Sequence, residues 1–259
     1  MGISNAHWPA AAEPFEGTKC GALPHKLPVS NDQRSKDIIC IVYIMFQRIN
    51  KIKEKGYTPD LIFDIGAEKG SWTRDMLNIY PYSTYILCEA IDYAELNNFN
   101  TSNFIVIKEL LFDSEKEVDW YEMRNTGDSI FKEKGNHFKN CVAIKRKTIT
   151  LNNLIKSKNI VENKKNILIK IDCQGAEISI LKGATDILSK TDFIILEIPL
   201  FGQYNEGVPN FLEHIQFMDS IGFIPYDIVD NHYINGFNRQ IDMIFISKSH
   251  NFNSMTEYH

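Results

Sequence analysis

The stretch LIFDIGAEKG, residues 61–70, joins a buried-strand pattern to a glycine turn. Four of its first five residues are apolar, Asp64 interrupts them, and glycines stand at positions 66 and 70. A short apolar run that ends in a glycine turn and opens into a helix is typical of the first strand of a parallel α/β sheet. The turn is therefore predicted to lie at the carboxyl edge of the sheet, where such folds bind ligands.

The composition of this turn favours one class of nucleotide ligand. The GxGxxG string of NAD sites is absent, and a carboxylate at Asp64 would repel a pyrophosphate but suits an ammonium or a sulfonium. Gly66 and Gly70 permit positive φ and close approach of the backbone, and a helix that opens at Gly70 favours a carboxylate at its N-terminus. We expect Asp64, Gly66, Ala67 and Gly70 to bind S-adenosylmethionine (SAM), and the alternative is a strand end without a ligand.

Further apolar runs alternate with helical patterns along the chain. The runs occupy 85–89, 104–108, 167–171, 193–198, 223–229 and 243–247. The expected helices occupy 70–79, 93–98, 150–157, 176–189 and 208–221. This alternation predicts a Rossmann-like α/β fold with a seven-stranded, mostly parallel sheet. The last two runs are separated by DNHYINGFNRQID, read as a loop, so the last strand is expected to be antiparallel.

Other segments interrupt or flank this frame. EVDWYEM at 117–123 and CVAIKRKTI at 141–149 alternate in polarity and predict an inserted β-hairpin. The whole chain is expected to have four parts: an irregular arm at 1–36, a helix at 37–57, the α/β domain at 58–249 and a tail at 250–259.

Composition argues against several classes of function, although a local basic patch stays possible. The net charge of −5 provides no global field to attract nucleic acid, so general nucleic-acid binding is not expected. The longest apolar run, residues 38–46, is too short to cross a bilayer, and no secretory signal is visible. Five cysteines without a CxxC pair indicate reduced thiols in the cytoplasm.

The ends of the second and third runs add candidate ligand-binding residues. Glu89, followed by Ala90, ends the second run, where an acid can accept hydrogen bonds from both hydroxyls of a ribose. Phe112 and Asp113 follow the third run, where a ring and a carboxylate could receive an adenine. Phe112 and Asp113 taken alone fit an ordinary turn equally well.

The string ILIKIDCQGAE, residues 167–177, carries a polar line on an apolar strand. Lys170, Asp172 and Gln174 alternate and so point to the same side. Lysine and aspartate are rarely buried without partners. We expect these side chains, with Asp172 among the cofactor contacts, to face the ligand crevice; an internal paired network is the alternative.

In chain order, DIGAEKGSWT, ILCEA, KRKTITLNNLI, ILIKIDCQGAEISILKGA and FIILEI resemble the FkbM family of SAM-dependent methyltransferases. The resemblance covers roughly residues 58–247. It implies a Rossmann-like fold, SAM as methyl donor and O-methylation of small molecules or glycans. The positions that match family motifs are Asp64, Gly66 and Gly70 in the donor loop, Glu89 at the ribose, Asp113 at the adenine, and Asp172, Gln174 and Glu177 in an acidic signature. Glu68 departs from the asparagine common in the family, and the second motif lacks the usual proline after the acid.

Methyl transfer to an alcohol requires alignment and a general base. Asp172 and Glu197 are the preferred bases, Lys170 would hold one of them ionised, and His232, expected in the loop before the last strand, is a secondary candidate. The acceptor is expected between residues 125–129 and 201–207. Asp172, Glu197 and His232 could instead hold a divalent metal, but no close ligand spacing supports one and none is predicted.

Alternative functions stay open at this stage. Lys170, Asp172 and Glu197 loosely match the pattern of nucleic-acid ribose methyltransferases, against which the acidic composition argues. A non-catalytic module that retains the fold is a second alternative, and an NAD-dependent oxidoreductase is disfavoured. The acceptor and the oligomeric state are left open.

Overall fold

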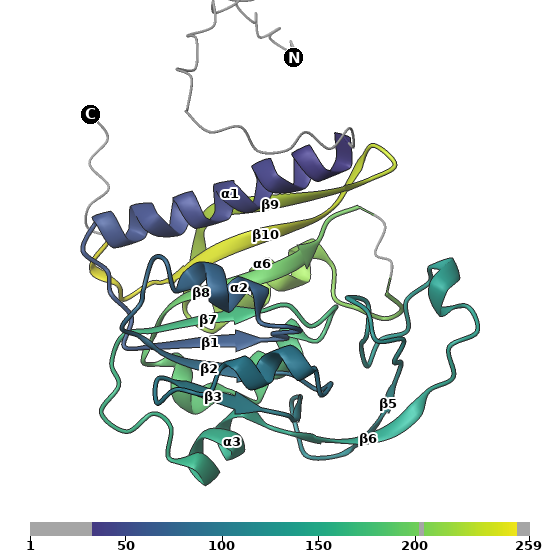
Figure 1. Cartoon of the computed structure of the whole chain (residues 1–259), viewed down its shortest axis with the longest axis horizontal. Coiled ribbons are helices and arrows are strands. Elements are labelled where there is room, and N and C mark those ends of the chain that lie inside the picture. Colours follow the sequence, from purple (N-terminus) through teal and green to yellow (C-terminus); the bar gives the residue numbers. More distant parts are fainter. Residues whose placement is uncertain (1–32, 202–204, 253–259) are drawn as a thin grey trace, which may run out of the picture.

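The computed structural model describes residues 33–201 and 205–252, and Figure 1 shows their arrangement. The expected irregular arm at 1–36 lies outside the described residues except for its last four, which are helical. The expected tail at 250–259 lies outside them after residue 252.

A seven-stranded sheet in the order β3-β2-β1-β7-β8-β10-β9 forms the centre of the molecule (Figure 1). Its strands are β1 (Leu61–Ile65), β2 (Thr84–Cys88), β3 (Phe104–Ile107), β7 (Ile167–Ile171), β8 (Thr191–Pro199), β9 (Phe223–Ile234) and β10 (Phe237–Ser247). Strand β10 is antiparallel to both of its neighbours, and the pairs among the other five strands are parallel. The predicted mostly parallel sheet with an antiparallel last strand is confirmed. The strand order reverses between β1 and β7.

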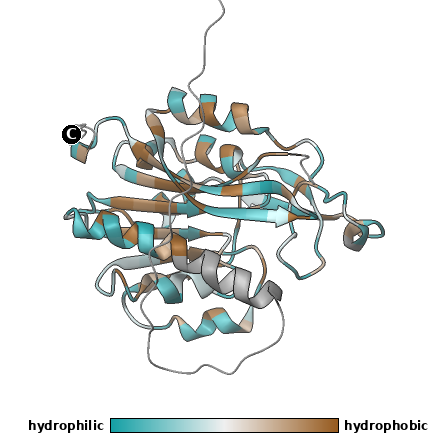
Figure 2. Cartoon of the chain, turned by 90° about the horizontal axis from the view of Figure 1, so that it is seen from above, coloured by the Kyte–Doolittle hydropathy of each residue, from teal (hydrophilic) through white to brown (hydrophobic). Residues whose placement is uncertain are grey.

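Helices cover the sheet, and several of them carry both hydrophobic and hydrophilic residues (Figure 2). They are α1 (Gln33–Glu54), α2 (Ser71–Met76), α3 (Leu151–Lys158), α4 (Glu177–Lys182), α5 (Thr185–Leu188) and α6 (Phe211–Ser220), with 3₁₀ turns η1 (Ala94–Asn98) and η2 (Asn136–Phe138). The helix expected at 93–98 is therefore a 3₁₀ turn. The helix expected at 176–189 is broken at Gly183, whose carbonyl accepts a hydrogen bond from the backbone N–H of Asn152. None of the helices in the described ranges combines the length and apolarity needed to cross a membrane.

A second, smaller sheet stands beside the first in the order β4-β6-β5. Strands β5 (Glu117–Trp120) and β6 (Ile144–Ile149) form the predicted antiparallel pair. Strand β4 (Leu110–Leu111) adds a parallel third member that was not expected, because two residues are too short to show a period.

The last two strands form a long hairpin instead of flanking a loop. Strand β9 ends at Ile234 and strand β10 begins at Phe237. Asn235 and Gly236 join them, with φ of 53° and 78°. Asn-Gly is the pair that two-residue hairpin turns prefer, because both central residues need positive φ. The expectation of a loop at 230–242 is therefore wrong, and His232 lies on strand β9.

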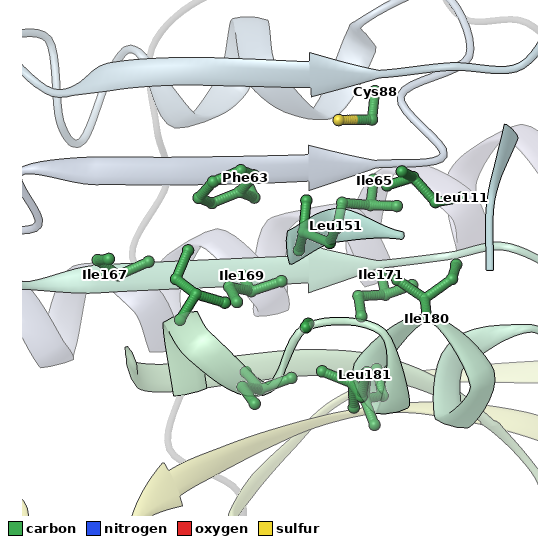
Figure 3. Close-up of a cluster of buried hydrophobic side chains, with 14 of the residues drawn as sticks. Phe63, Ile65, Cys88, Leu111, Leu151, Ile167, Ile169, Ile171, Ile180 and Leu181 are labelled. Atoms are coloured by element: carbon green, nitrogen blue, oxygen red, sulfur yellow. The ribbon is translucent and has the colours of Figure 1, made fainter. Parts of the chain in front are cut away.

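Both faces of the sheet are buried. All five residues of β1 and of β7 are buried. Phe63, Ile169 and Leu151 belong to the cluster on the face that packs against α3 and α4 (Figure 3), and Ile62 and Leu168 belong to the cluster on the opposite face, with α1 and α2. Because a charged group on these strands has no solvent to face, it needs a partner within the protein.

Candidate active site

A cavity of about 1680 Å³ lies at the carboxyl ends of β1, β2 and β7, where the strand order reverses. The segments that line it are the turns after these strands, the chain around β4, the insert between β5 and β6, and the tip of the β9–β10 hairpin. The position agrees with the rule for open α/β sheets.

The turn after β1 is packed against the turn after β7. Gly66 has φ of 77°, and a β-carbon on it would lie 2.0 Å from the backbone oxygen of Asp172, so no side chain fits there. The backbone N–H groups of Gly66 and Ala67 donate to the carbonyl of Cys88 at 2.9 and 3.1 Å, so they do not serve as donors to a ligand. Gly66 and Ala67 line the cavity, whereas Gly70 packs against Phe99 and does not.

Glu89 stands at the cavity wall and is held by the turn after β1. Its two carboxylate oxygens each accept one backbone hydrogen bond of 2.8 Å, from Glu68 and from Ile91. Burial raises the pKa of Glu89, and these backbone hydrogen bonds oppose the rise. Glu68 takes a positive φ of 47°, a conformation that asparagine adopts more readily than glutamate. Ala90 also lines the cavity.

Asp64 lies beneath the cavity and takes no part in its wall. Its side chain is fully buried, accepts a 2.7 Å hydrogen bond from Thr73 and lies 3.6 Å from Lys170 Nζ. Burial raises the pKa of Asp64, and the charge of Lys170 opposes this. The expectation that Asp64 faces a ligand is therefore wrong, because its position on β1 directs the side chain towards the face covered by α2.

Lys170 links this buried acid to the cavity. It is adjacent to Asp64 in the strand register, and its Nζ also lies 3.3 Å from Asp172 Oδ2. Burial acts to lower the pKa of Lys170, but the charges of Asp172, Asp64 and Asp242 outweigh it, so the net pKa is raised and the ammonium persists. The two arrangements expected from the sequence are therefore both present. Lys170, Asp172 and Gln174 line the cavity, and they also contact one another.

Asp172 and Glu197 face each other across one amide. Gln174 Nε2 donates to Asp172 Oδ1 at 3.2 Å and to Glu197 Oε2 at 2.8 Å. Burial acts to raise the pKa of Asp172, but the charge and hydrogen bond of Lys170 leave that pKa below its ordinary value. Burial, followed by the charge of Asp172, raises the pKa of Glu197 well above its usual range. Of the two carboxyl groups, Asp172 is therefore the more readily ionised and Glu197 the less acidic.

The hairpin adds three titratable groups beside Glu197. His232 Nε2 lies 3.8 Å from both Asp230 Oδ2 and Asp242 Oδ1, and Asp242 is opposite Glu197 in the strand register. Hydrogen bonding to Asp242, and then its charge, raise the pKa of His232, although burial opposes this. Sequence reasoning missed Asp230 and Asp242; the Asn-Gly pair was the signal that would have extended both strands and brought these acids to the site.

Phe112 and Asp113 do not reach the cavity. Phe112 is buried in the core with its N–H donating to the carbonyl of Ile149, and Asp113 pairs with Lys116 at 2.9 Å. The pairing of β4 with β6 turns the chain away, so Leu110 and Leu111 form the wall here. The expected adenine contacts are therefore wrong.

The insert between β5 and β6 closes one side of the cavity. Residues 125–128 line it, and Ser129 Oγ donates a 3.0 Å hydrogen bond to the carbonyl of Gln174. Of the other expected acceptor segment, 201–207, residues 202–204 lie outside the described residues, and Phe201 is exposed.

Comparison with known proteins identifies similar families and structures. The model of the Methyltransferase FkbM domain matches residues 64–225. Among solved structures, a methyltransferase FkbM from Methylobacillus flagellatus KT is 15% identical with a TM-score of 0.44, over 72% of this chain and 43% of that one. This chain thus spans less than half the length of that protein. No curated protein matches.

Two further solved structures cover most of both chains. The 1,6-didemethyltoxoflavin-N1-methyltransferase of Burkholderia thailandensis, with bound S-adenosylhomocysteine, is 9% identical over 87% of this chain and 94% of that one, with a TM-score of 0.44. The magnesium protoporphyrin IX methyltransferase of Synechocystis PCC 6803, with bound SAM, is 6% identical over 85% and 86%, with a TM-score of 0.43.

Proposed function

This chain belongs to the FkbM family of SAM-dependent methyltransferases, and we propose that it transfers the methyl group of SAM to a hydroxyl of a sugar, a glycan or another hydroxylated small molecule. The observation that carries the O-methylation proposal is the ionised Asp172 at the cavity wall, supported by Lys170 from below. An alcohol must lose a proton as it is methylated, and a fixed carboxylate within reach can accept it.

The donor half of the cavity fits SAM, whose sulfonium supplies an activated methyl group when bound. We assign its binding to Gly66, Ala67, Glu89 and Ala90, with Leu110 and Leu111 as an apolar wall. Each oxygen of Glu89 accepts one backbone hydrogen bond and retains a lone pair, so the carboxylate can still receive two ribose hydroxyls. Asp64 is assigned no contact with the donor and acts through Lys170.

The acceptor half supplies the proton chemistry. We assign Asp172 as the general base, because Lys170 and the Gln174 amide fix the direction of its lone pairs. Glu197 is the less acidic of the two carboxyl groups and shares the Gln174 amide with Asp172, which fixes their relative position. His232, beside Asp230 and Asp242 on the hairpin, remains a secondary candidate base.

The lining of the cavity supports a sugar over a nucleic acid. Its described acidic residues outnumber its lysines and arginines by eight to three, and a phosphate backbone would be repelled. The acids are Glu68, Glu89, Glu109, Asp128, Glu133, Asp172, Glu197 and Asp230, and the bases are Lys134, Lys170 and Arg239.

An aromatic pair beside the cavity suits the apolar face of a sugar ring. Phe201 and Phe237 are 60% and 52% exposed, and their ring centroids lie 5.4 Å apart. Arg239, which lines the cavity, lies over both rings at 5.1 and 5.3 Å. We assign this pair to the acceptor. The unpaired thiols of Cys88, Cys141 and Cys173 support a reducing, cytoplasmic compartment for the reaction.

We expect Glu89→Gln to raise the dissociation constant for S-adenosylhomocysteine about tenfold to hundredfold, because hydrogen bonds to a charged carboxylate are each worth about 1.5–3 kcal/mol. Titration calorimetry measures this constant. Asp92→Asn removes a nearby exposed carboxylate that does not line the cavity and serves as the control. Equal affinity in Glu89→Gln and in the unchanged protein would remove Glu89 from the donor site.

The acceptor class is tested by methyl transfer from labelled SAM to a panel of saccharides, RNA oligonucleotides and amines. We expect label on saccharide hydroxyls, and loss of at least a hundredfold of that rate in Asp172→Asn, because general bases contribute about 10²–10⁴-fold. Label on RNA would favour the ribose methyltransferase alternative. Intact binding of S-adenosylhomocysteine without transfer to any acceptor would favour the non-catalytic module.

A further inference from the structure

Four carboxylates stand in one row across the acceptor end of the sheet. Glu197 is opposite Asp242 on β10, and Asp242 is opposite Asp230 on β9. Asp172 directly follows the end of β7, whose last residue pairs with Leu196, so it occupies the next place in the row. Like charges directly opposite one another destabilise a sheet. Such a row therefore requires compensation by positive charge.

Within the described residues, a lysine lies at one end of this row and a histidine at the other. Lys170 lies within 4 Å of Asp64 and Asp172. The other end has the imidazole of His232, 3.8 Å from Asp230 and Asp242. The Nε2 atom of His232 is buried and has no close hydrogen-bond partner among the described residues.

Asp242 is enclosed, and its partner is distant. The residue is 9% exposed, and within the described ranges its carboxylate contacts His232 in an ion pair of 3.8 Å. A buried carboxylate whose partner is this far away is costly in an apoprotein. A bound cation would supply a closer partner.

The geometry of three side chains matches a metal site. One ligand atom each from Glu197, His232 and Asp242 lie within 4.8 Å of one another. Ligand atoms about 2.0–2.2 Å from one ion lie roughly 3–4 Å apart, so small inward side-chain rotations would close the site. Glu197 and Asp242 are fixed on neighbouring strands, which sets the separation of the two carboxylates.

We propose that Glu197, His232 and Asp242 bind a divalent transition-metal cation at the acceptor end of the cavity. One imidazole with two carboxylates is a ligand set for Mn²⁺ or Zn²⁺, since Mg²⁺ prefers oxygen ligands alone. Glu197 and His232 line the cavity, so a cation held by them would be accessible to an acceptor bound there. Resting on the proposed function, the cation would bind the acceptor hydroxyl beside Asp172 and favour its deprotonation.

Mn²⁺ binding to the full chain is measured by calorimetry and by the loss of the free-ion electron paramagnetic resonance signal. We expect one Mn²⁺ per chain, and at least a tenfold weaker affinity in Asp242→Asn and in His232→Gln. The matched control is Asp227→Asn on β9, which pairs with Arg48 at 3.5 Å and does not line the cavity, and its affinity should equal that of the unchanged protein. Affinity for S-adenosylhomocysteine, measured in the same variants, reports whether each remains folded.

Two outcomes would overturn this metal site: no Mn²⁺ or Zn²⁺ binding by the folded protein, or binding that Asp242→Asn and His232→Gln leave unchanged. Transfer assays with and without a chelator separate the metal site from the proposed function. Saccharide methylation that is insensitive to chelator, without cation binding, rejects the metal site and keeps the O-methyltransferase. Specific Mn²⁺ binding without methylation of any saccharide rejects the proposed acceptor and keeps the metal site.

Discussion

Replacing Lys170 by methionine is expected to lower the free energy of unfolding by about 3–5 kcal/mol, the cost of removing one partner from a buried ion pair. Lys170 is 8% exposed, and its Nζ lies between Asp64 and Asp172. Asp64 Oδ1 makes no hydrogen bond within the described protein, so the variant leaves a fully buried carboxylate without its cation. The rate of methyl transfer is also expected to fall in this variant, because the positive charge of Lys170 no longer keeps Asp172 ionised.

Chemical denaturation of the variant and of a matched control measures this effect. Lys165→Met replaces an exposed lysine near the start of the same strand and should change the free energy of unfolding by less than about 0.5 kcal/mol. Adding Asp64→Asn to the Lys170→Met variant should restore part of the lost stability, because the uncompensated carboxylate is then absent. A loss below about 1 kcal/mol in Lys170→Met would contradict the assigned pairing.

The pH dependence of the same variant has a definite sign. In the unchanged protein the pKa of Asp172 is held below its ordinary value, so its contribution to stability is present above the unfolded pKa and is lost as pH falls through the folded pKa. Without Lys170, burial would raise the folded pKa of Asp64 further above its unfolded value and would bring that of Asp172 above its own. Protonation then favours the folded state, so the difference in stability between variant and unchanged protein should narrow as pH falls.

Gly66→Ala is expected to be the most damaging substitution at the turn after β1. The added β-carbon would lie 2.0 Å from the carbonyl oxygen of Asp172, at a φ of 77° that alanine disfavours. Alanine at positive φ costs about 1–2 kcal/mol, and overpacking against backbone adds about 1–3 kcal/mol. Relief of the clash moves the backbone of Asp172, so the affinity for S-adenosylhomocysteine and the rate of methyl transfer should both fall.

A second glycine separates backbone strain from the clash. Gly56 has φ of 95° and has no atom within 4 Å of an added β-carbon, so Gly56→Ala carries the conformational cost alone. Denaturation curves should show a larger loss for Gly66→Ala than for Gly56→Ala. Equal losses would mean that the turns after β1 and β7 are not in close contact.

The sheet was predictable because its central strands are continuous apolar runs. The expected boundaries of β1 and β7, 61–65 and 167–171, are those observed. The long hairpin was missed because its outer half is polar, and polar alternation at the edge of a sheet looks like a loop.

Residues of the site could be predicted where they directly follow the end of a strand. They could not be predicted where contacts between distant segments decide whether a side chain reaches the cavity. Asp172 and Glu89 reach the cavity as expected. Asp64 does not, because in a strand buried on both faces the sequence does not distinguish a side chain aimed at the crevice from one aimed at a helix. Phe112 and Asp113 depend on the β4–β6 contact, and Asp242 depends on its register with Glu197, neither of which is a local property.

The place of β10 between β8 and β9 has a consequence for biosynthesis (Figure 1). On the ribosome, β9 emerges before the strand that connects it to the sheet, so it has no sheet partner until β10 has been translated. The donor turn and the base at the end of β7 can assemble earlier, because β1, β2, β7 and β8 precede the hairpin. A nascent chain halted before β10 would therefore expose the unpaired edge of β8 and lack Asp242, so the acceptor side cannot be completed until β10 has been translated.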